Sequence, residues 1–175
     1  MDILPVPTPG PTVSAEQFNQ GFVIYNDGFT SNWMLNPWGG SADLSSTSAA
    51  YEGMNSIELT IRPGEGIAFG GGMTPDILQN YTHLVFYFNG GETADKNTYI
   101  EMFVGEDVSV GEQAYLTDYI DSGPIQPGVW YQVSIPLSVL NPERLLFEWF
   151  NMMDASGNGA STFYIDEIRF VSAVP

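Results

Sequence analysis

Cysteine is absent from this sequence, and only Arg62, Lys96, Arg144 and Arg169 carry a positive charge. Without cysteine the chain forms no disulfide bond, no thiolate zinc site and no thiol nucleophile. Against four basic residues stand 21 acidic ones, which gives a formal net charge of −17. This charge repels phosphate backbones and anionic lipid head groups, so neither nucleic acid nor a membrane is an expected partner. Neutral ligands and divalent cations remain.

Long hydrophobic runs are also absent. No apolar stretch approaches the ~18 residues of a membrane span, and the N-terminus lacks the basic-then-apolar order of a signal peptide. We therefore expect a soluble chain whose export signal, if any, lies outside this sequence. The opening MDILPVPTPGPTVS is rich in proline and is typical of an interdomain linker. It predicts a linker remnant over residues 1–16, followed by one domain over residues 17–173.

Short apolar runs separated by turn residues dominate the rest of the chain. The sequence contains 19 glycines and 12 prolines, and 14% of its residues are aromatic, a composition that favours strands and tight turns over helices. Two short helical turns are expected at 75–80 and 137–140. The spacing of the runs predicts an all-β protein, a two-sheet antiparallel β-sandwich of the jelly-roll type. The expected strands lie at 23–29, 41–45, 55–61, 66–71, 83–89, 98–105, 114–120, 130–136, 145–152 and 162–171.

One predicted strand carries an unusual outer face. In TYIEMFV the alternate residues on one side are aliphatic, whereas the other side presents Tyr99, Glu101 and Phe103. The stretch AYLTDYI repeats the pattern with Tyr115 and Tyr119. Two aromatic side chains beside a carboxylate indicate a surface that something covers, either a ligand or a long loop of the same chain.

The order of motifs along residues 22–171 resembles a known class of module. VIYNDGF, PWGGSADLSS, YEGMNSIELTI, HLVFYFNGG, PGVWYQVSIPLS and DASG leading to FYIDEIRF follow one another. The ordered set is similar to the β-jelly-roll carbohydrate-binding modules appended to polysaccharide-degrading enzymes. The strongest pieces of the resemblance are the strand that begins after Gly128 and the terminal YIDEI.

The resemblance implies a secreted, extracellular, non-catalytic module. Such a module binds a neutral plant-type polysaccharide, a β-glucan, cellulose or a hemicellulose, and keeps an attached glycoside hydrolase close to it. The residue types agree with this function, because aromatic rings pack on the C–H faces of sugars and Asp, Glu, Asn and Gln bind their hydroxyl groups. The net charge of −17 favours a neutral polysaccharide or oligosaccharide over a uronate-rich one.

The expected ligand contacts fall into two groups. Trp33 and Trp38 lie in SNWMLNPWGG, which reads as a loop, and either of them contacts a ligand or plugs one end of the sandwich. The second group is the outer surface of 98–105 and 114–120 together with a neighbouring strand: Tyr87, Tyr99, Glu101, Phe103, Tyr115, Tyr119 and Glu148. In LLFEWFNM both alternations are apolar, so the core side of that run stays open.

Two other function classes compete with binding. Glu101 and Glu148 would serve a glycoside hydrolase or a lyase of jelly-roll fold if their strands brought the two carboxyl groups together. The sequence lacks closely spaced acids of the form E-x-D-x-E and a G-x-S-x-G elbow, and its one histidine, His83, opens a strand, where a structural role is more common. A structural assembly domain of a cell surface is the third class.

The terminal strand poses a separate question. Alternation in STFYIDEIRF places Asp166 on the side of Tyr164, Ile168 and Phe170, and a buried carboxylate needs a cation or several hydrogen-bond donors. The resemblance implies a structural Ca²⁺ between the first and last strands, held here by Asp27, Glu52, Asn55 and Asp166. The alternative is that Asp166 accepts hydrogen bonds from backbone N–H groups or pairs with an arginine.

Overall fold

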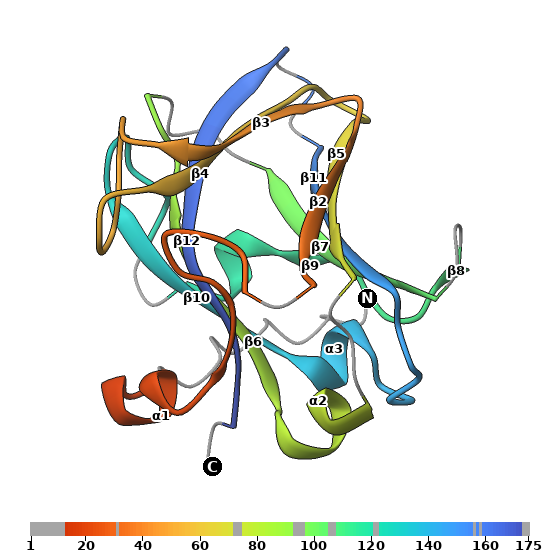
Figure 1. Ribbon diagram of the computed structural model, residues 1–175. Helices are drawn as coiled ribbons and strands as arrows, with labels where there is room; N and C mark the ends of the chain where they lie inside the picture. Colours follow the sequence, from red (N-terminus) through yellow and green to blue (C-terminus); the bar gives the residue numbers. More distant parts are fainter. Residues whose placement is uncertain are drawn as a thin grey trace.

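Two antiparallel sheets pack face to face in the computed structural model (Figure 1). The structure describes residues 13–30, 32–71, 75–92, 97–104, 108–120, 123–155, 157 and 159–172. Among these residues, no helix is both long and apolar enough to span a membrane. The predicted antiparallel β-sandwich is confirmed.

Sheet A contains the first and last strands. Its order is β10-β6-β12-β4-β3, and β1 pairs with the second half of β12. The long β12 therefore lies at the centre, where it contacts three other strands. The strands are β1 (Phe22–Tyr25), β3 (Ser41–Ser46), β4 (Ser56–Ile61), β6 (His83–Asn89), β10 (Trp130–Pro136) and β12 (Ser161–Val171).

Sheet B has the order β2-β5-β11-β7-β8, and β9 also pairs with β7. Its strands are β2 (Met34–Trp38), β5 (Gly66–Gly70), β7 (Thr98–Val104), β8 (Val108–Ser109), β9 (Ala114–Tyr115) and β11 (Trp149–Asp154). The short helices are α1 (Ala15–Asn19), α2 (Pro75–Asn80) and α3 (Leu137–Leu140), with one 3-10 turn, η1 (Leu116–Asp118). The three α-helices lie at the lower end of the sandwich in Figure 1.

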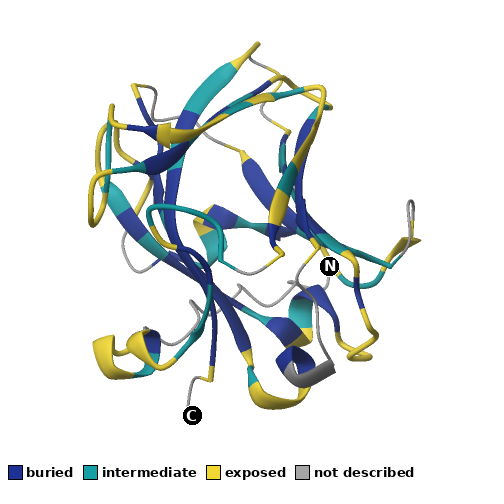
Figure 2. Ribbon diagram, viewed as in Figure 1, coloured by how far each residue is buried: buried dark blue, intermediate teal, exposed yellow. Residues whose placement is uncertain are grey.

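The core lies between the inner faces of the two sheets. Alternate residues of each strand point inward, as the period of two requires. Phe88 and Phe163 meet at 5.3 Å within sheet A, and Phe69 stacks on Phe150 at 4.9 Å within sheet B. Buried residues run along β6 and β12, whereas β3 at the edge is mostly exposed (Figure 2). The core thus occupies the inner faces, and on the outer face of sheet A a second small cluster forms where Phe18 of α1 packs on Val85 and Val171.

Three segments differ from the sequence prediction. Residues 34–38, expected as a loop, form β2, and residues 114–120, expected as one strand, form the two-residue β9 and then η1. Within the predicted linker, Val13 is buried and Ser14 caps α1, accepting a hydrogen bond from the backbone N–H of Gln17. Residues 1–12 of that predicted linker lie outside the described residues.

The terminal strand contains a bulge that changes the expected side-chain alternation. Glu167 has φ of 52°, in the left-handed region, and the pairing of β12 with β6 shifts between Asp166 and Arg169. Ile168 and Phe170 therefore point into the core, whereas Tyr164 and Asp166 lie on the outer side of sheet A. The prediction that Asp166 faces the core is wrong, although the side chain is fully buried.

Candidate functional site

The outer face of sheet B carries three rows of side chains that cross its strands. Their order follows from the register of β2, β5, β11 and β7. The two outer rows contain aromatic and sulfur-containing side chains, and the middle row is polar. The first row is Trp38, Gly66, Met153, Tyr99 and Tyr115; the middle row is Asn36, Ala68, Asn151 and Glu101; the third is Met34, Gly70, Trp149, Phe103 and Ser109.

Two tryptophan rings lie against β5 at its two glycines. A Cβ atom on Gly66 would lie 2.5 Å from Cζ2 of Trp38, and one on Gly70 would lie 2.2 Å from Cε3 of Trp149. The two glycines are four residues apart in β5, so the rings are separated by about 13 Å along the strand. A methyl group at either position would therefore collide with the indole that lies against it. Trp38 remains 42% exposed and Trp149 is partly exposed.

Polar side chains occupy the space between the two rings. Asn36 and Asn151 pair with Ala68 from either side, and Glu101 lies opposite Asn151. Oδ1 of Asn151 is buried and has no hydrogen-bond partner among the described residues. A ligand hydroxyl that donated a hydrogen bond to this oxygen would therefore displace no existing partner. The middle row offers both donors and acceptors between two apolar platforms.

Tyr99 and Tyr115 close one end of this face. Their rings lie 5.4 Å apart, and the hydroxyl of Tyr99 lies 3.2 Å from Sδ of Met153. Burial raises the pKa of the Tyr99 phenol, and Glu101 beside it acts in the same direction. The phenol therefore stays protonated. Tyr99 is itself buried and supports the rows, whereas Tyr115 is partly exposed.

A hollow borders the opposite end, next to Trp149. It has a volume of about 340 Å³ and is lined by Gly71, Leu146, Phe147, Glu148 and Trp149. Leu146 is 57% exposed there. The outer face of sheet B therefore ends at one side in tyrosines and at the other in an open apolar hollow.

The structure brings together Trp38, Tyr99, Glu101, Phe103 and Tyr115 from the predicted ligand contacts. They lie on the outer side of two strands, β2 and β7, and on the short β9. Trp38 belongs to β2, the strand that was expected to be a loop. Five predicted residues thus share one face.

Trp33 does not belong to this face. Its side chain is 4% exposed and packs between Phe150 and Phe170, at ring distances of 6.0 and 6.1 Å. The prediction of a ligand contact at Trp33 is wrong, and the alternative, a plug within the sandwich, describes its position. Trp33 fills core volume because the chain crosses from one sheet to the other just before β2.

Three further predicted contacts also lie elsewhere. Tyr87 belongs to β6 of sheet A, where it stacks on Tyr51 at 3.5 Å, so it does not border the outer face of sheet B. Tyr119 ends η1 and packs against the core. Glu148 precedes β11 and lines the hollow beside Trp149 without joining the rows.

Sequence reasoning missed Trp149, Met153 and the two asparagines. The side of the strand on which Trp149 lies could not be predicted, because both alternations of LLFEWFNM are apolar. The sequence signal that could have located Trp149 is GIAFG in β5, in which the alternate residues on one side are all small. Small residues are required there because large rings from both neighbouring strands cover that side.

Glu101 and Glu148 are not paired with each other across β7 and β11. Their strands are neighbours, as the enzyme hypothesis requires, but Glu101 lies opposite Asn151, and Phe103 lies opposite Trp149. Glu148 directly precedes Trp149, and its backbone N–H donates a hydrogen bond to the carbonyl of Phe103 at 2.8 Å. Glu101 thus belongs to the middle row, whereas Glu148 lies outside the three rows.

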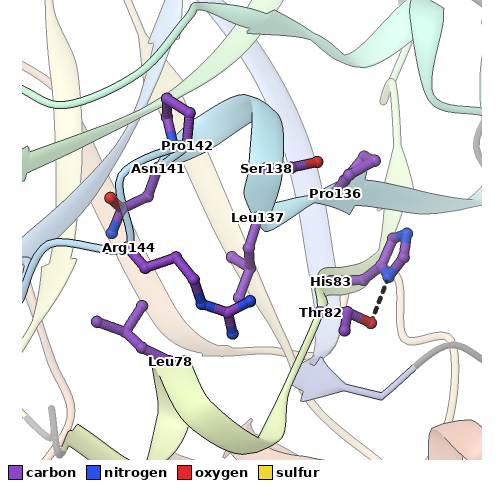
Figure 3. Close-up of a pocket in the computed structure, with 9 residues that line it drawn as sticks. All are labelled: Leu78, Thr82, His83, Pro136, Leu137, Ser138, Asn141, Pro142 and Arg144. Atoms are coloured by element: carbon purple, nitrogen blue, oxygen red, sulfur yellow. Dashed lines mark hydrogen bonds between the residues drawn. The ribbon is translucent and has the colours of Figure 1, made fainter.

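His83 lies in a separate pocket at the end of the sandwich that carries the helices (Figure 3). The pocket has a volume of about 220 Å³, and its lining includes Thr82, Ser138 and Arg144 but no carboxylate. Nδ1 of His83 lies 2.9 Å from the hydroxyl of Thr82, and burial lowers the pKa of the imidazole. The histidine is therefore neutral, and none of the described residues that line the pocket is an acid, which fits the structural role expected for His83.

The predicted calcium residues do meet, at the turn of residues 51–55. Oδ2 of Asp166 accepts hydrogen bonds from the backbone N–H groups of Tyr51 and Glu52, at 2.9 and 3.3 Å. Its Oδ1 accepts one from the N–H of Glu167 at 2.8 Å. Oδ1 of Asp27 accepts from Met54 and Asn55, at 2.8 and 2.7 Å. One turn therefore binds two carboxylates through its amides.

This arrangement does not fit a calcium ion. Calcium takes six to eight oxygen ligands, whereas the turn presents N–H groups to Asp166 and Asp27. Among the described residues, no group of three or more Asp, Glu or His side chains is placed to hold a metal. Burial raises the pKa of Asp166, and its three amide donors oppose that shift. Calcium stays an untested prediction, and the geometry favours its alternative, binding of the carboxylates by backbone amides.

The glycine beneath Trp38 provides a first test of the site. In Gly66→Ala the new methyl group meets the far end of the Trp38 indole and must displace it. We expect glycan affinity to fall by about tenfold, the loss of one stacked ring, with a change of only a few degrees in melting temperature. Gly28→Ala is the matched control, since nothing lies within 4 Å of its Cβ position. Equal affinity of the two variants would show that the Trp38 ring is not used.

Comparison with known proteins places the fold. No family model and no curated protein sequence matches this chain. Among solved structures, the C-terminal family 22 carbohydrate-binding module of Clostridium thermocellum Xyn10B matches with a TM-score of 0.57 and 15% identity, over 92% of this chain and 98% of that one. A family 29 module from Piromyces equi matches at 0.52 and 14%, over 86% and 89%.

One match is an enzyme. The β-1,2-glucanase from Parabacteroides distasonis has a TM-score of 0.57 and 18% identity over 88% of this chain, but the match covers only 25% of the glucanase. The binding modules, in contrast, match over almost their full length. At these identities the comparisons establish the architecture: the chain has the β-sandwich fold of carbohydrate-binding modules.

Proposed function

We propose that this chain is a non-catalytic carbohydrate-binding module that binds a neutral polysaccharide on the outer face of sheet B. The observation that carries the proposal is the pair of indoles, Trp38 and Trp149, lying on β5 with a polar row between them. The fold supports it, because matching structures are described as xylan-binding domains and as a module complexed with mannohexaose.

The positions of the two indoles support one course for the sugar chain. One pyranose ring stacks on each indole, and the intervening unit passes over Ala68, the smallest side chain of the middle row. A spacing of about 13 Å is the length of a short oligosaccharide segment in an extended chain. Asn36, Asn151 and Glu101 then hydrogen-bond to its hydroxyl groups. The ligand chain accordingly runs along β5.

The expected affinity is modest. Each stacked ring contributes on the order of 1 kcal/mol beyond the area it buries, so a few shallow contacts give micromolar or weaker binding. Chain length compensates, since an internal segment of a polymer binds in many registers. A β-linked glucan, xylan or mannan has the extended, hydroxyl-rich form that this face fits, and the charge of −17 disfavours a polyuronate.

The biological setting belongs to the same proposal. A module of this kind keeps an attached polysaccharide-degrading enzyme at its substrate, and such enzymes act outside the cell. Glu101 and Glu148 are not opposite each other in the register of β7 and β11, which supports binding over hydrolysis, because catalysis needs two carboxyl groups about 5 to 9.5 Å apart across one glycosidic bond.

Glu101→Gln distinguishes binding from catalysis. The amide keeps one acceptor and the shape of the side chain, so we expect a several-fold loss of affinity in isothermal titration with oligosaccharides, as one charge-assisted hydrogen bond becomes a neutral one. Neither protein should release reducing sugar. Release by the native protein that disappears in Glu101→Gln would establish the enzyme alternative.

A further inference from the structure

The outer face of sheet A also carries a row of aromatic and polar side chains across five strands. The registers of β3 with β4, β4 with β12, β12 with β6 and β6 with β10 join into one continuous line. The row is Asp43, Glu58, Tyr164, Asn89 and Trp130. It combines the residue types found on the opposite face, aromatic rings beside carboxylate and amide groups.

Part of sheet A is already covered by the chain itself. Phe18 of α1 packs on Val85 and Tyr87, and the turn of residues 51–55 buries Asp166. Tyr164 remains partly exposed, although Ser48, from the segment that leads to that turn, hydrogen-bonds to its hydroxyl. There the described residues line a hollow of about 390 Å³: Gly91, Glu92, Ala160, Ser161, Thr162 and Tyr164.

The chemistry of this hollow suits a sugar ring. Tyr164 is partly exposed; burial raises the pKa of its phenol, Glu58 and Glu92 act in the same direction, and a hydrogen bond with the side chain of Ser48 acts in the opposite one. Glu58 accepts a hydrogen bond from the hydroxyl of Ser46 through Oε2, at 2.8 Å. The tyrosine ring thus provides a stacking surface beside carboxylate and hydroxyl groups.

A second aromatic cluster continues the row at the edge of the sheet. Trp130 lies two strands from Tyr164, roughly 10 Å away, and meets the edge of Tyr51 at 6.0 Å. Tyr51 is 43% exposed. An extended sugar chain crossing the strands of sheet A would meet the hollow first and this cluster next.

We infer that the outer face of sheet A is a second carbohydrate-binding site, centred on Tyr164, for the same class of neutral, hydroxyl-rich glycan. The inference rests on the proposed function, since it assigns a second surface to that activity. The two sites point away from each other because the sheets pack through their inner faces. One module therefore holds two polysaccharide chains and cross-links them.

Three variants test the inference: Tyr164→Ala, Trp38→Ala/Trp149→Ala, and the triple variant. With a soluble β-glucan, xylan or mannan that the native protein binds, native protein should raise solution viscosity by cross-linking, and the first two variants should lose that effect. In affinity gels Tyr164→Ala should keep nearly native retardation. The double variant should still be retarded weakly. The triple variant should bind about tenfold more weakly than the double variant, because it lacks one more stacked ring.

The outcomes separate the two proposals. If the double and triple variants bind equally and Tyr164→Ala cross-links like native protein, the second site is refuted while the proposed function stands. If native protein binds no glycan at all, both fall. Tyr164→Phe keeps the ring and loses the hydroxyl; it should cross-link at higher protein concentration than native protein, whereas a defect as large as that of Tyr164→Ala would contradict stacking.

Discussion

Replacing Trp38 and Trp149 together by alanine will lower affinity for a soluble polysaccharide by on the order of a hundredfold. Each indole lies against a glycine of β5 and is at least partly exposed, so truncation of either tryptophan removes one surface on which a sugar ring can stack. A stacked ring is worth about 1 kcal/mol beyond its buried area, and 1.4 kcal/mol is a factor of ten. Isothermal titration with an oligosaccharide that spans both rings measures the loss directly.

The single variants give the internal control. Trp38→Ala and Trp149→Ala should each cost about tenfold, and their effects should add, since the two rings are about 13 Å apart and share no contact. Melting temperatures should change little, because neither ring lies in the core. Trp33→Ala is the contrasting case, since it removes a buried ring and should destabilise the fold instead. Native affinity in the double variant would place the ligand elsewhere.

Asp166→Ala will have the largest effect on stability. The carboxylate is fully buried and accepts backbone hydrogen bonds from Tyr51, Glu52 and Glu167. Its removal leaves three amide N–H groups without an acceptor, each at a cost of about 1 to 3 kcal/mol. We expect a loss of about 3 to 5 kcal/mol in the free energy of unfolding and a melting temperature lower by about 10 °C or more. Chemical denaturation and differential scanning calorimetry measure both quantities.

Two controls accompany this variant. Glu143→Ala removes an exposed carboxylate and should leave the melting temperature within one or two degrees. Excess EDTA should leave native protein unchanged, because amides already bind the two carboxylates. A fall of several degrees in EDTA, restored by Ca²⁺, would instead establish the calcium site that the resemblance implies.

Strands with one plainly apolar side could be predicted from sequence. Residues 83–89 and 130–136 match β6 and β10 at both ends, and the outward side of β7 is as expected. The alternation of TYIEMFV is unambiguous because its inner residues are aliphatic and its outer ones include a carboxylate. For such strands the period of two is enough.

β2 was missed for a physical reason. It contains Asn36 and Pro37, residues that disfavour strands, and four of its five residues are exposed. β2 is an edge strand, and among the described strands its partner is β5. The N–H group that Pro37 lacks is therefore not needed for pairing with a second strand. The omission mattered, because β2 carries Trp38 and Asn36 to the candidate site.

The remaining differences depend on long-range packing. The bulge at Glu167 moves Tyr164 and Asp166 to the outer side of sheet A, and local alternation contains no sign of it. Tyr87 and Tyr99 both alternate like surface residues, yet they belong to different sheets. The sheet to which a strand belongs depends on the strand order of the fold, and the sequence pattern of a single strand does not encode this order.

The most direct test of the central claim combines binding and hydrolysis in one sample. Native protein and Trp38→Ala/Trp149→Ala are run through affinity gels that contain neutral β-glucans, xylans or mannans, and the same mixtures are assayed for reducing sugar. We predict that at least one neutral polysaccharide retards the native protein strongly and the double variant weakly, with no sugar released by either. Equal retardation of the two proteins, or release of reducing sugar by the native protein, would contradict a non-catalytic binding site on the outer face of sheet B.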